Sequence, residues 1–63
     1  MSLSDNLRRL RITDGHSVED VAEASGLSVA LVAAIENGRT RVPPKVVEAL
    51  ARHFRISAAE LTR

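Results

Sequence analysis

The stretch Ser17–Gly38, SVEDVAEASGLSVALVAAIENG, decides the fold of this chain. Apolar residues recur at helical spacing in its first half and again in its second half. Gly26 separates the two halves, and glycine can adopt the left-handed conformation that a tight turn between helices requires. The inward-facing residues are Val18, Val21 and Ala22 in the first helix and Leu31, Val32 and Ile35 in the second. The stretch therefore predicts a helix-turn-helix over about residues 17–37.

Polar residues at the ends of both helices indicate their boundaries. Ser17 with Asp20 three residues later resembles a capping box, so we expect the first helix to start at Ser17. Ser28 is expected to cap the second helix, and Gly38 is expected to stop it. In a helix-turn-helix, the second helix, here about residues 28–37, is the one that enters the major groove of DNA.

The segment before this stretch predicts another helix. It runs from about Asp5 to Thr13, with Ser4 as its N-cap. Gly15 follows at a position suited to a left-handed C-terminal cap. The residues that share one face of this helix are Leu3, Leu7 and Leu10.

Two more helices are predicted after the loop at residues 39–44. Pro43 and Pro44 cannot continue a helix but can open one, which then extends to about Phe54. Its inward face holds Val46, Val47, Leu50, Ala51 and Phe54. Ser57 and Glu60 form a capping box for a final short helix, from Ala58 to about Thr62, which offers Leu61 to the core. Together the segments predict a compact all-α fold of five helices, a single domain over residues 1–63.

The composition narrows the function classes. With 63 residues the chain makes one small domain, and without cysteine it forms neither disulfides nor thiolate metal sites. No apolar run approaches a membrane span and the N-terminus does not resemble a signal peptide, so we expect a cytoplasmic protein. Phe54 is the only aromatic residue, which disfavours single-strand binding through base stacking. His16 and His53 have no further ligand at metal spacing, and no catalytic constellation is present, so we expect no metal, no cofactor and no enzymatic activity.

Basic residues gather after the second helix of the central stretch. The net charge is only +1, but no acidic residue lies between Asn37 and Val47. Polar and basic side chains there can reach phosphate oxygens, and these are Asn37, Arg39, Thr40, Arg41 and Lys45. Ser28, at the start of the second helix, is a further candidate for a phosphate contact. The alternative is an ordinary solvated loop.

The outward face of the second helix has no hydrogen-bonding side chain in its middle. The base-facing positions are Val29, Ala30, Ala33 and Ala34, and the only base feature that they contact favourably is the methyl group of thymine. An exposed apolar strip of this kind also marks protein contacts in many proteins. Two interpretations therefore stay open. Either the short side chains let the helix sit close to the groove and read thymine methyls and DNA shape, or the face binds a protein.

Four segments together resemble the Cro/cI repressor-type helix-turn-helix family, also called the XRE family. They are LRRLRITDG at 7–15, SVEDVAEASGLS at 17–28, IENGRTRVP at 35–43 and ALARHFRISAAEL at 49–61. The resemblance covers almost the whole chain and implies a five-helix, lambda-repressor-like domain that binds operator DNA, usually as a dimer. It also implies a dimer surface at the end of the fourth helix and the fifth helix, around Phe54 to Leu61.

The resemblance assigns roles to individual residues as well. The family often pairs an arginine at the end of its first helix with the glutamate before Asn-Gly, which implies an ion pair between Arg11 and Glu36 here. The family also places a phosphate-contacting glutamine where this chain has Val18. Ser17 and the nearby backbone amides are what remains for that contact.

From these observations we expect a sequence-specific, double-stranded DNA-binding transcription regulator, a repressor by family type. It would act as a homodimer on a two-fold operator and associate with the nucleoid when bound to DNA. The alternative is a protein-interaction module of the same fold that has lost base readout, with its partner at the outward face of the second helix.

Overall fold

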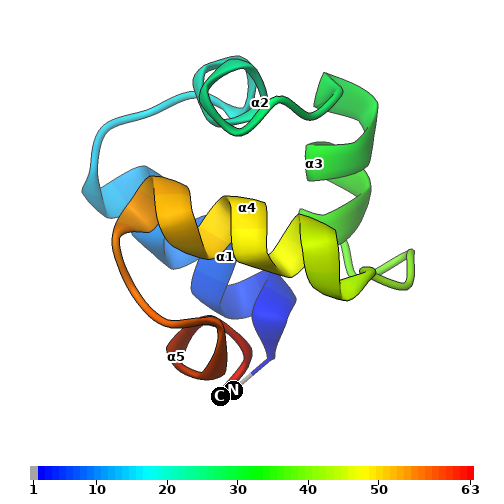
Figure 1. Ribbon diagram of the computed structural model, residues 1–63. Helices are drawn as coiled ribbons and strands as arrows, with labels where there is room; N and C mark the ends of the chain where they lie inside the picture. The colour runs from blue at the N-terminus through cyan, green and yellow to red at the C-terminus, as the bar shows by residue number, and fades with distance from the viewer. Residues whose placement is uncertain (1) are drawn as a thin grey trace.

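The computed structural model describes residues 2–63 and contains five helices (Figure 1). They are α1 (Leu3–Thr13), α2 (Val18–Ser25), α3 (Val29–Glu36), α4 (Pro44–Phe54) and α5 (Ala58–Thr62). Within residues 2–63 every regular element is a helix, which confirms the predicted all-α fold. None of these helices has the length and apolar character needed to cross a membrane.

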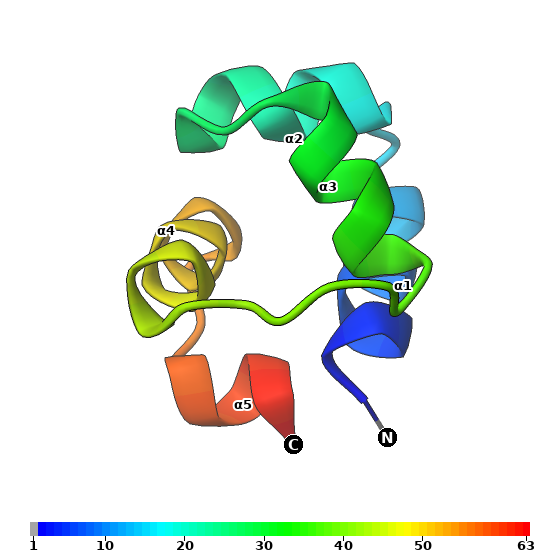
Figure 2. The ribbon, with the colours of Figure 1, turned by 90° about the vertical axis from the view of Figure 1, so that its right-hand side faces the viewer.

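The helices enclose one core between two ends of the molecule. Figures 1 and 2 both show α2 at one end and α5 at the other, with α1 and α4 between them. Each of the five helices contributes to the buried apolar cluster, which consists of Leu7, Val21, Ala22, Val32, Ile35, Val47, Leu50, Ala51 and Leu61. The inward faces predicted from helical spacing are therefore confirmed, although six of their residues are only partly buried and pack against the edge of the cluster, namely Leu3, Leu10, Val18, Leu31, Val46 and Phe54.

The start of α1 differs from the prediction. The helix begins at Leu3 rather than Asp5, and its N-cap is Ser2 rather than Ser4. The Asp5 N–H donates to the Ser2 Oγ at 3.3 Å. Both serines satisfy the local rules for a cap, but a start at Leu3 places the Leu3 side chain on the helix face that packs against the core. Tertiary packing thus selects between two locally equivalent caps.

Four helices end with the same backbone motif. One or two residues after each helix end, a residue has a positive φ, and the N–H of the residue after it donates back to a carbonyl in the last turn. In these bonds a backbone N–H donates to a backbone carbonyl at 2.8–3.1 Å, and the donor and acceptor residues are His16 and Arg11, Leu27 and Ala22, Arg39 and Ala34, and Ile56 and Ala51. Glycine occupies the left-handed position after the first three helices. After α4 the position holds Arg55 at φ 58°, a left-handed residue that was not predicted, because arginine rarely adopts this conformation.

One buried amide joins the two ends of the chain. The Asn6 side chain on α1 is only 3% exposed, and its Nδ2 donates to the carbonyls of Leu61 and Arg63 at 2.7 and 3.1 Å. The Asn6 Oδ1 accepts from Arg9 at 3.2 Å. Because every polar atom of this buried side chain has a partner, Asn6 fixes α5 against α1 without the cost of an unpaired buried group.

Candidate nucleic-acid interface

The turn between α2 and α3 has the geometry that the sequence predicts. Gly26 adopts φ 70° and ψ 27°, and the Leu27 N–H donates to the Ala22 carbonyl at 2.8 Å. Ser28 then caps α3, its Oγ accepting from the Leu31 N–H at 3.1 Å. The turn therefore leads directly into α3 with its first N–H groups directed away from the helix body.

The two faces of α3 are clearly distinct. Val32 and Ile35 are 0% and 2% exposed and anchor the helix to the core. On the opposite face, Val29 is 44% exposed and Ala30 is exposed, whereas Ala33 and Ala34 are half-buried. The face predicted to contact bases is thus available at its N-terminal half and partly covered farther along.

The loop between α3 and α4 lies on the same side of the molecule as α3 (Figures 1 and 2). The five residues predicted to contact phosphates, Asn37, Arg39, Thr40, Arg41 and Lys45, are all exposed. Among residues 2–63 the ion pairs involve only Glu36, so the charges of Arg39, Arg41 and Lys45 have no acidic partner there. These cations are therefore available to an anion from outside the chain.

The start of α4 offers fewer backbone donors than an ordinary helix start. Pro43 and Pro44 have no N–H, and the N–H groups of Val46 and Val47 both donate to the Pro43 carbonyl. The Lys45 N–H remains as the donor in this first turn. Side chains of the loop, rather than amides of α4, must therefore supply most of the polar contacts here.

The start of α2 is occupied by the protein's own carboxylate. The Ser17 N–H donates to the Asp20 Oδ2 at 3.0 Å, and the Asp20 N–H donates to the Ser17 Oγ at 3.0 Å, which confirms the capping box. The hydrogen bond from the Ser17 backbone N–H lowers the pKa of Asp20, so this carboxyl is charged at neutral pH. A negative group thus stands where Ser17 is predicted to meet a phosphate, whereas the first turn of α3 contains no acidic residue.

A buried ion pair joins α1 to α3. Glu36 is 5% exposed, and both of its carboxylate oxygens accept hydrogen bonds from Arg11, at 2.6 and 3.0 Å. This is the pair that the resemblance implies. Arg11 also donates to the His16 carbonyl at 3.0 Å, and its hydrogen bond with Glu36 raises the pKa of Arg11. The pair holds α3 by its C-terminal end.

Arg8 is a second cation at this pair, and this role was not predicted. It donates to the Glu36 backbone carbonyl at 2.6 Å, and its Nε lies 3.8 Å from the carboxylate. Its position three residues before Arg11 places both arginines on one side of α1, a spacing that could have identified it. Glu36 is therefore held through both its side chain and its backbone.

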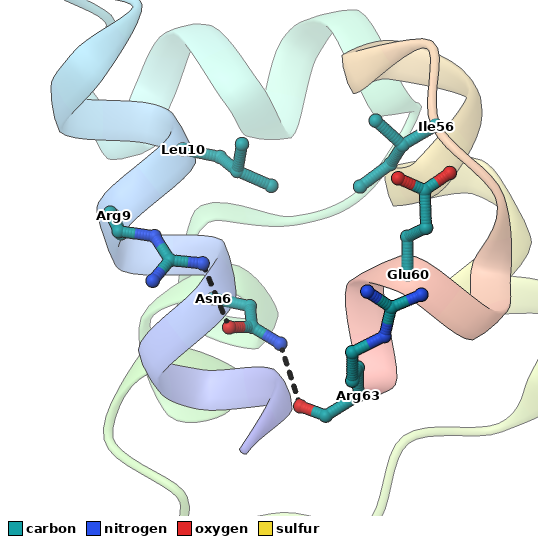
Figure 3. A pocket seen from close by; sticks show the side chains of 6 residues that line it. All are labelled: Asn6, Arg9, Leu10, Ile56, Glu60 and Arg63. Carbon is teal, nitrogen blue, oxygen red and sulfur yellow. Dashed lines mark hydrogen bonds between the residues drawn. The ribbon is translucent and has the colours of Figure 1, made fainter. Parts of the chain in front are cut away.

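A groove of about 410 Å³ lies between α1 and α5. Figure 3 shows Leu10 and Ile56 facing each other across it, with charged side chains at its edge. Its lining residues are Asn6, Arg9, Leu10, Ile56, Glu60 and Arg63. From the segment predicted as a dimer surface, Ile56 and Glu60 line this groove, whereas Leu61 is 0% exposed and belongs to the core.

The fold also brings the two histidines together. The rings of His16, between α1 and α2, and His53, on α4, lie with their centroids 5.7 Å apart. The rings of His53 and Phe54 lie with their centroids 4.7 Å apart and their planes at 71°. This contact could not be predicted, because the two histidines lie far apart along the chain.

The sequence and the fold were compared with those of known proteins. The model of a family described as "Helix-turn-helix domain" matches residues 2–63 of this chain. The restriction-modification controller protein C.AhdI from Aeromonas hydrophila is 34% identical, with a TM-score of 0.89 over 94% of this chain and 89% of that chain. The clp gene regulator ClgR from Corynebacterium glutamicum is 27% identical, with a TM-score of 0.86 over 94% of this chain and 63% of that chain.

Among curated proteins, no sequence matches this chain significantly. The family match covers nearly all of the chain, and both structural neighbours share its fold, with TM-scores of 0.89 and 0.86. The chain therefore belongs to the helix-turn-helix domain family, within the DNA-binding transcription regulators of the Cro/cI repressor (XRE) type.

Proposed function

We propose that this protein binds specific sites on double-stranded DNA with α3 in the major groove and so regulates transcription. The observation that carries the proposal is the exposed loop after α3, where Arg39, Arg41 and Lys45 have no acidic partner within residues 2–63. Three unpaired cations beside a helix that projects from the surface suit the phosphate backbone next to an occupied groove. Both structural neighbours carry names of regulators, which supports the same conclusion.

The predicted phosphate contacts differ in strength. The loop side chains of Arg39 and Arg41 supply most of the affinity, aided by Lys45, Asn37 and Thr40. Ser28 contributes through the start of α3, which has no acid in its first turn. Ser17 contributes least, because the Asp20 carboxylate beside it repels a phosphate.

The DNA-bound form is a homodimer on a two-fold operator. A single domain of this size makes too few contacts for tight binding, and two copies related by a two-fold axis would double them. The groove between α1 and α5 suits such a contact, because Leu10 and Ile56 supply an apolar centre. Glu60 of one copy can approach Arg63 of the other, which makes the surface self-complementary.

Within the cell, the protein would act as a repressor on the nucleoid in the cytoplasm. This assignment rests on the family type and on the regulator names of the structural neighbours. A repressor needs only to occupy its operator, which the proposed dimer would do.

Selection of bound duplexes from a random pool at low salt tests the proposal. We expect a selected sequence with two-fold symmetry, and we expect Arg39→Ala to weaken binding to every duplex. Arg52→Ala, which removes an exposed arginine on α4, is the matched control and should leave binding unchanged. Failure to retain any duplex above the level of an unrelated protein would overturn the proposal.

The second candidate is a protein-interaction module that has lost base readout. The apolar outer face of α3 favours it, because Val29 and Ala30 are exposed without any hydrogen-bonding neighbour on that face. An NMR titration separates the two functions. Shifts of the Val29 and Ala33 signals with duplex DNA support the regulator, and shifts with a protein but not with DNA support the module.

A further inference from the structure

The outer face of α3 can offer a base nothing but methyl groups. Val29 and Ala30 are exposed, and Ala33 and Ala34 are half-buried behind them. The hydrogen-bonding side chains nearest to this face stand at its two ends, where Ser28 already bonds the Leu31 N–H and Asn37 leads into the basic loop. Any base pair under the middle of α3 therefore meets an apolar surface.

Such a surface discriminates between base pairs in one way. In the major groove every base pair presents donors and acceptors, and thymine alone among the four standard bases adds an apolar group, its C5-methyl. Donors or acceptors of a base that lose water against alanine side chains gain no new partner, which disfavours them. A C5-methyl group instead buries apolar area on both sides of the contact.

The dimensions of α3 limit how many base pairs are read. Four residues separate Val29 from Ala33, a rise of about 6 Å along the helix. This equals about two base-pair steps, at about 3.4 Å for each step along a strand. The side chains are short, so the helix backbone can approach the floor of the groove closely. The face thus suits methyl groups on two or three neighbouring base pairs.

Charge and size favour DNA over a protein as the occupant of this face. The loop that follows α3 carries exposed Arg39, Arg41 and Lys45, and the one acid of α3, Glu36, is buried and paired. A surface with this flanking charge complements a polyanion. Four short side chains, two of them half-buried, also provide far less than the about 800 Å² per partner of a stable protein interface.

We infer that α3 recognises the C5-methyl group itself rather than the base that carries it. The inference rests on the proposed DNA binding and adds the chemical class of its target, namely pyrimidines methylated at C5. Thymine and 5-methylcytosine place this methyl at the same position in the major groove. The protein would therefore distinguish 5-methylcytosine from cytosine at its site, and binding would respond to cytosine methylation there.

The test uses the duplex selected in the experiment above. At each position that α3 covers, it is synthesised with thymine or uracil opposite adenine, and with cytosine or 5-methylcytosine opposite guanine. We expect replacement of thymine by uracil to weaken binding about fourfold for each contacted methyl, from about 0.8 kcal/mol per buried methyl-sized group. We expect 5-methylcytosine to bind about fourfold more tightly than cytosine at the same position. Uracil placed outside the α3 footprint is the control and should have no effect.

A protein variant links the effect to α3. Val29→Ala removes two methyl groups from the exposed start of the helix without touching the core. At one position it should reduce the ratio of the affinity for the thymine duplex to the affinity for the uracil duplex. The same ratio at the other positions should not change, and neither should the stability of the protein to urea.

The outcomes separate the two proposals. If no duplex binds, the proposed DNA binding and this inference both fail. If a duplex binds but thymine and uracil versions bind equally at every position, or if the selected site has no thymine under α3, the inference alone is overturned.

Discussion

Two groups of arginines flank α3 and differ in what surrounds them. Arg8 and Arg11 extend from α1 to Glu36, a carboxylate that is only 5% exposed, and together they bond its side chain and its backbone. Arg39 and Arg41 lie in the loop after α3, exposed and without an acidic partner among residues 2–63. The presence of a buried acidic partner, rather than the arginine itself, therefore decides the role of each group. A cation bound to a buried acid stabilises the fold, whereas one without an acid is available to a ligand.

The largest effect is expected from Arg11→Met. This variant leaves the buried Glu36 carboxylate without its two-bond partner, which should cost about 3 kcal/mol of unfolding free energy. This loss is at the low end of the range for breaking a buried ion pair, because the Arg8 Nε remains 3.8 Å from the Glu36 carboxylate. Urea unfolding followed by circular dichroism measures it. If the midpoint does not change, the pair contributes no stability and the comparison fails.

A DNA effect without a stability effect is expected from Arg39→Ala and from Arg41→Ala. Each should lower the slope of log K against log salt by about 0.9, which corresponds to about eightfold weaker binding at 0.1 M salt. Fluorescence anisotropy across a salt series measures this slope. Unfolding in urea should stay within about 0.5 kcal/mol of the parent, because neither side chain has a partner to lose within residues 2–63. A large loss of stability in either variant would contradict the division of roles.

Arg8→Ala tests the more exposed arginine of the pair that bonds Glu36. Its side chain is 48% exposed, yet it bonds the Glu36 carbonyl at 2.6 Å. We expect a loss of about 1 kcal/mol in unfolding free energy, the usual net contribution of one hydrogen bond. A double variant with Arg11→Met should lose more than the sum of the two, because Glu36 then has neither cation. Strict additivity would show that Arg8 does not help to hold the carboxylate.

The smallest effect is expected from Asp20→Asn, which removes a negative charge at the start of α2 rather than a positive one. Asp20 has its pKa lowered by the Ser17 backbone N–H, so its charged form is favoured in the folded state. The stabilisation is therefore present above the pKa of the unfolded chain and is lost as the pH falls through the lower, folded value. Asp20→Asn should remove this part of the acid dependence of unfolding, and it should strengthen DNA binding at low salt. Weaker DNA binding by this variant would contradict the placement of a repelling charge at the start of α2.

Much of the fold follows from the sequence because local signals agree with packing. The capping boxes at Ser17 and Ser57, the cap at Ser28 and the turn at Gly26 are each specified by residues within a few positions of one another. Ser2 and Ser4 offered two equivalent caps, and only packing of Leu3 decided between them.

Polar residues inside an apolar face were harder to predict. Asn6 lies between Leu3 and Leu10 on the inward side of α1, a position that signals a buried amide, but its partners are carbonyls at the far end of the chain. The sequence also indicated that the middle of α3 has no hydrogen-bonding side chains. It did not indicate that Ala33 and Ala34 are half-buried, because that depends on the neighbouring elements.

The repeated backbone motif at the helix ends has a consequence for folding kinetics. Each of the four turns is closed by a hydrogen bond between residues five positions apart, so the path of the chain is set by local interactions. Chains with mainly local interactions reach their folded state in about microseconds to milliseconds. We expect this domain to fold on that timescale, with the Asn6 contacts to Leu61 and Arg63 as the step that joins distant parts of the chain. A regulator that folds this quickly would recover its DNA-binding surface almost at once after each local opening.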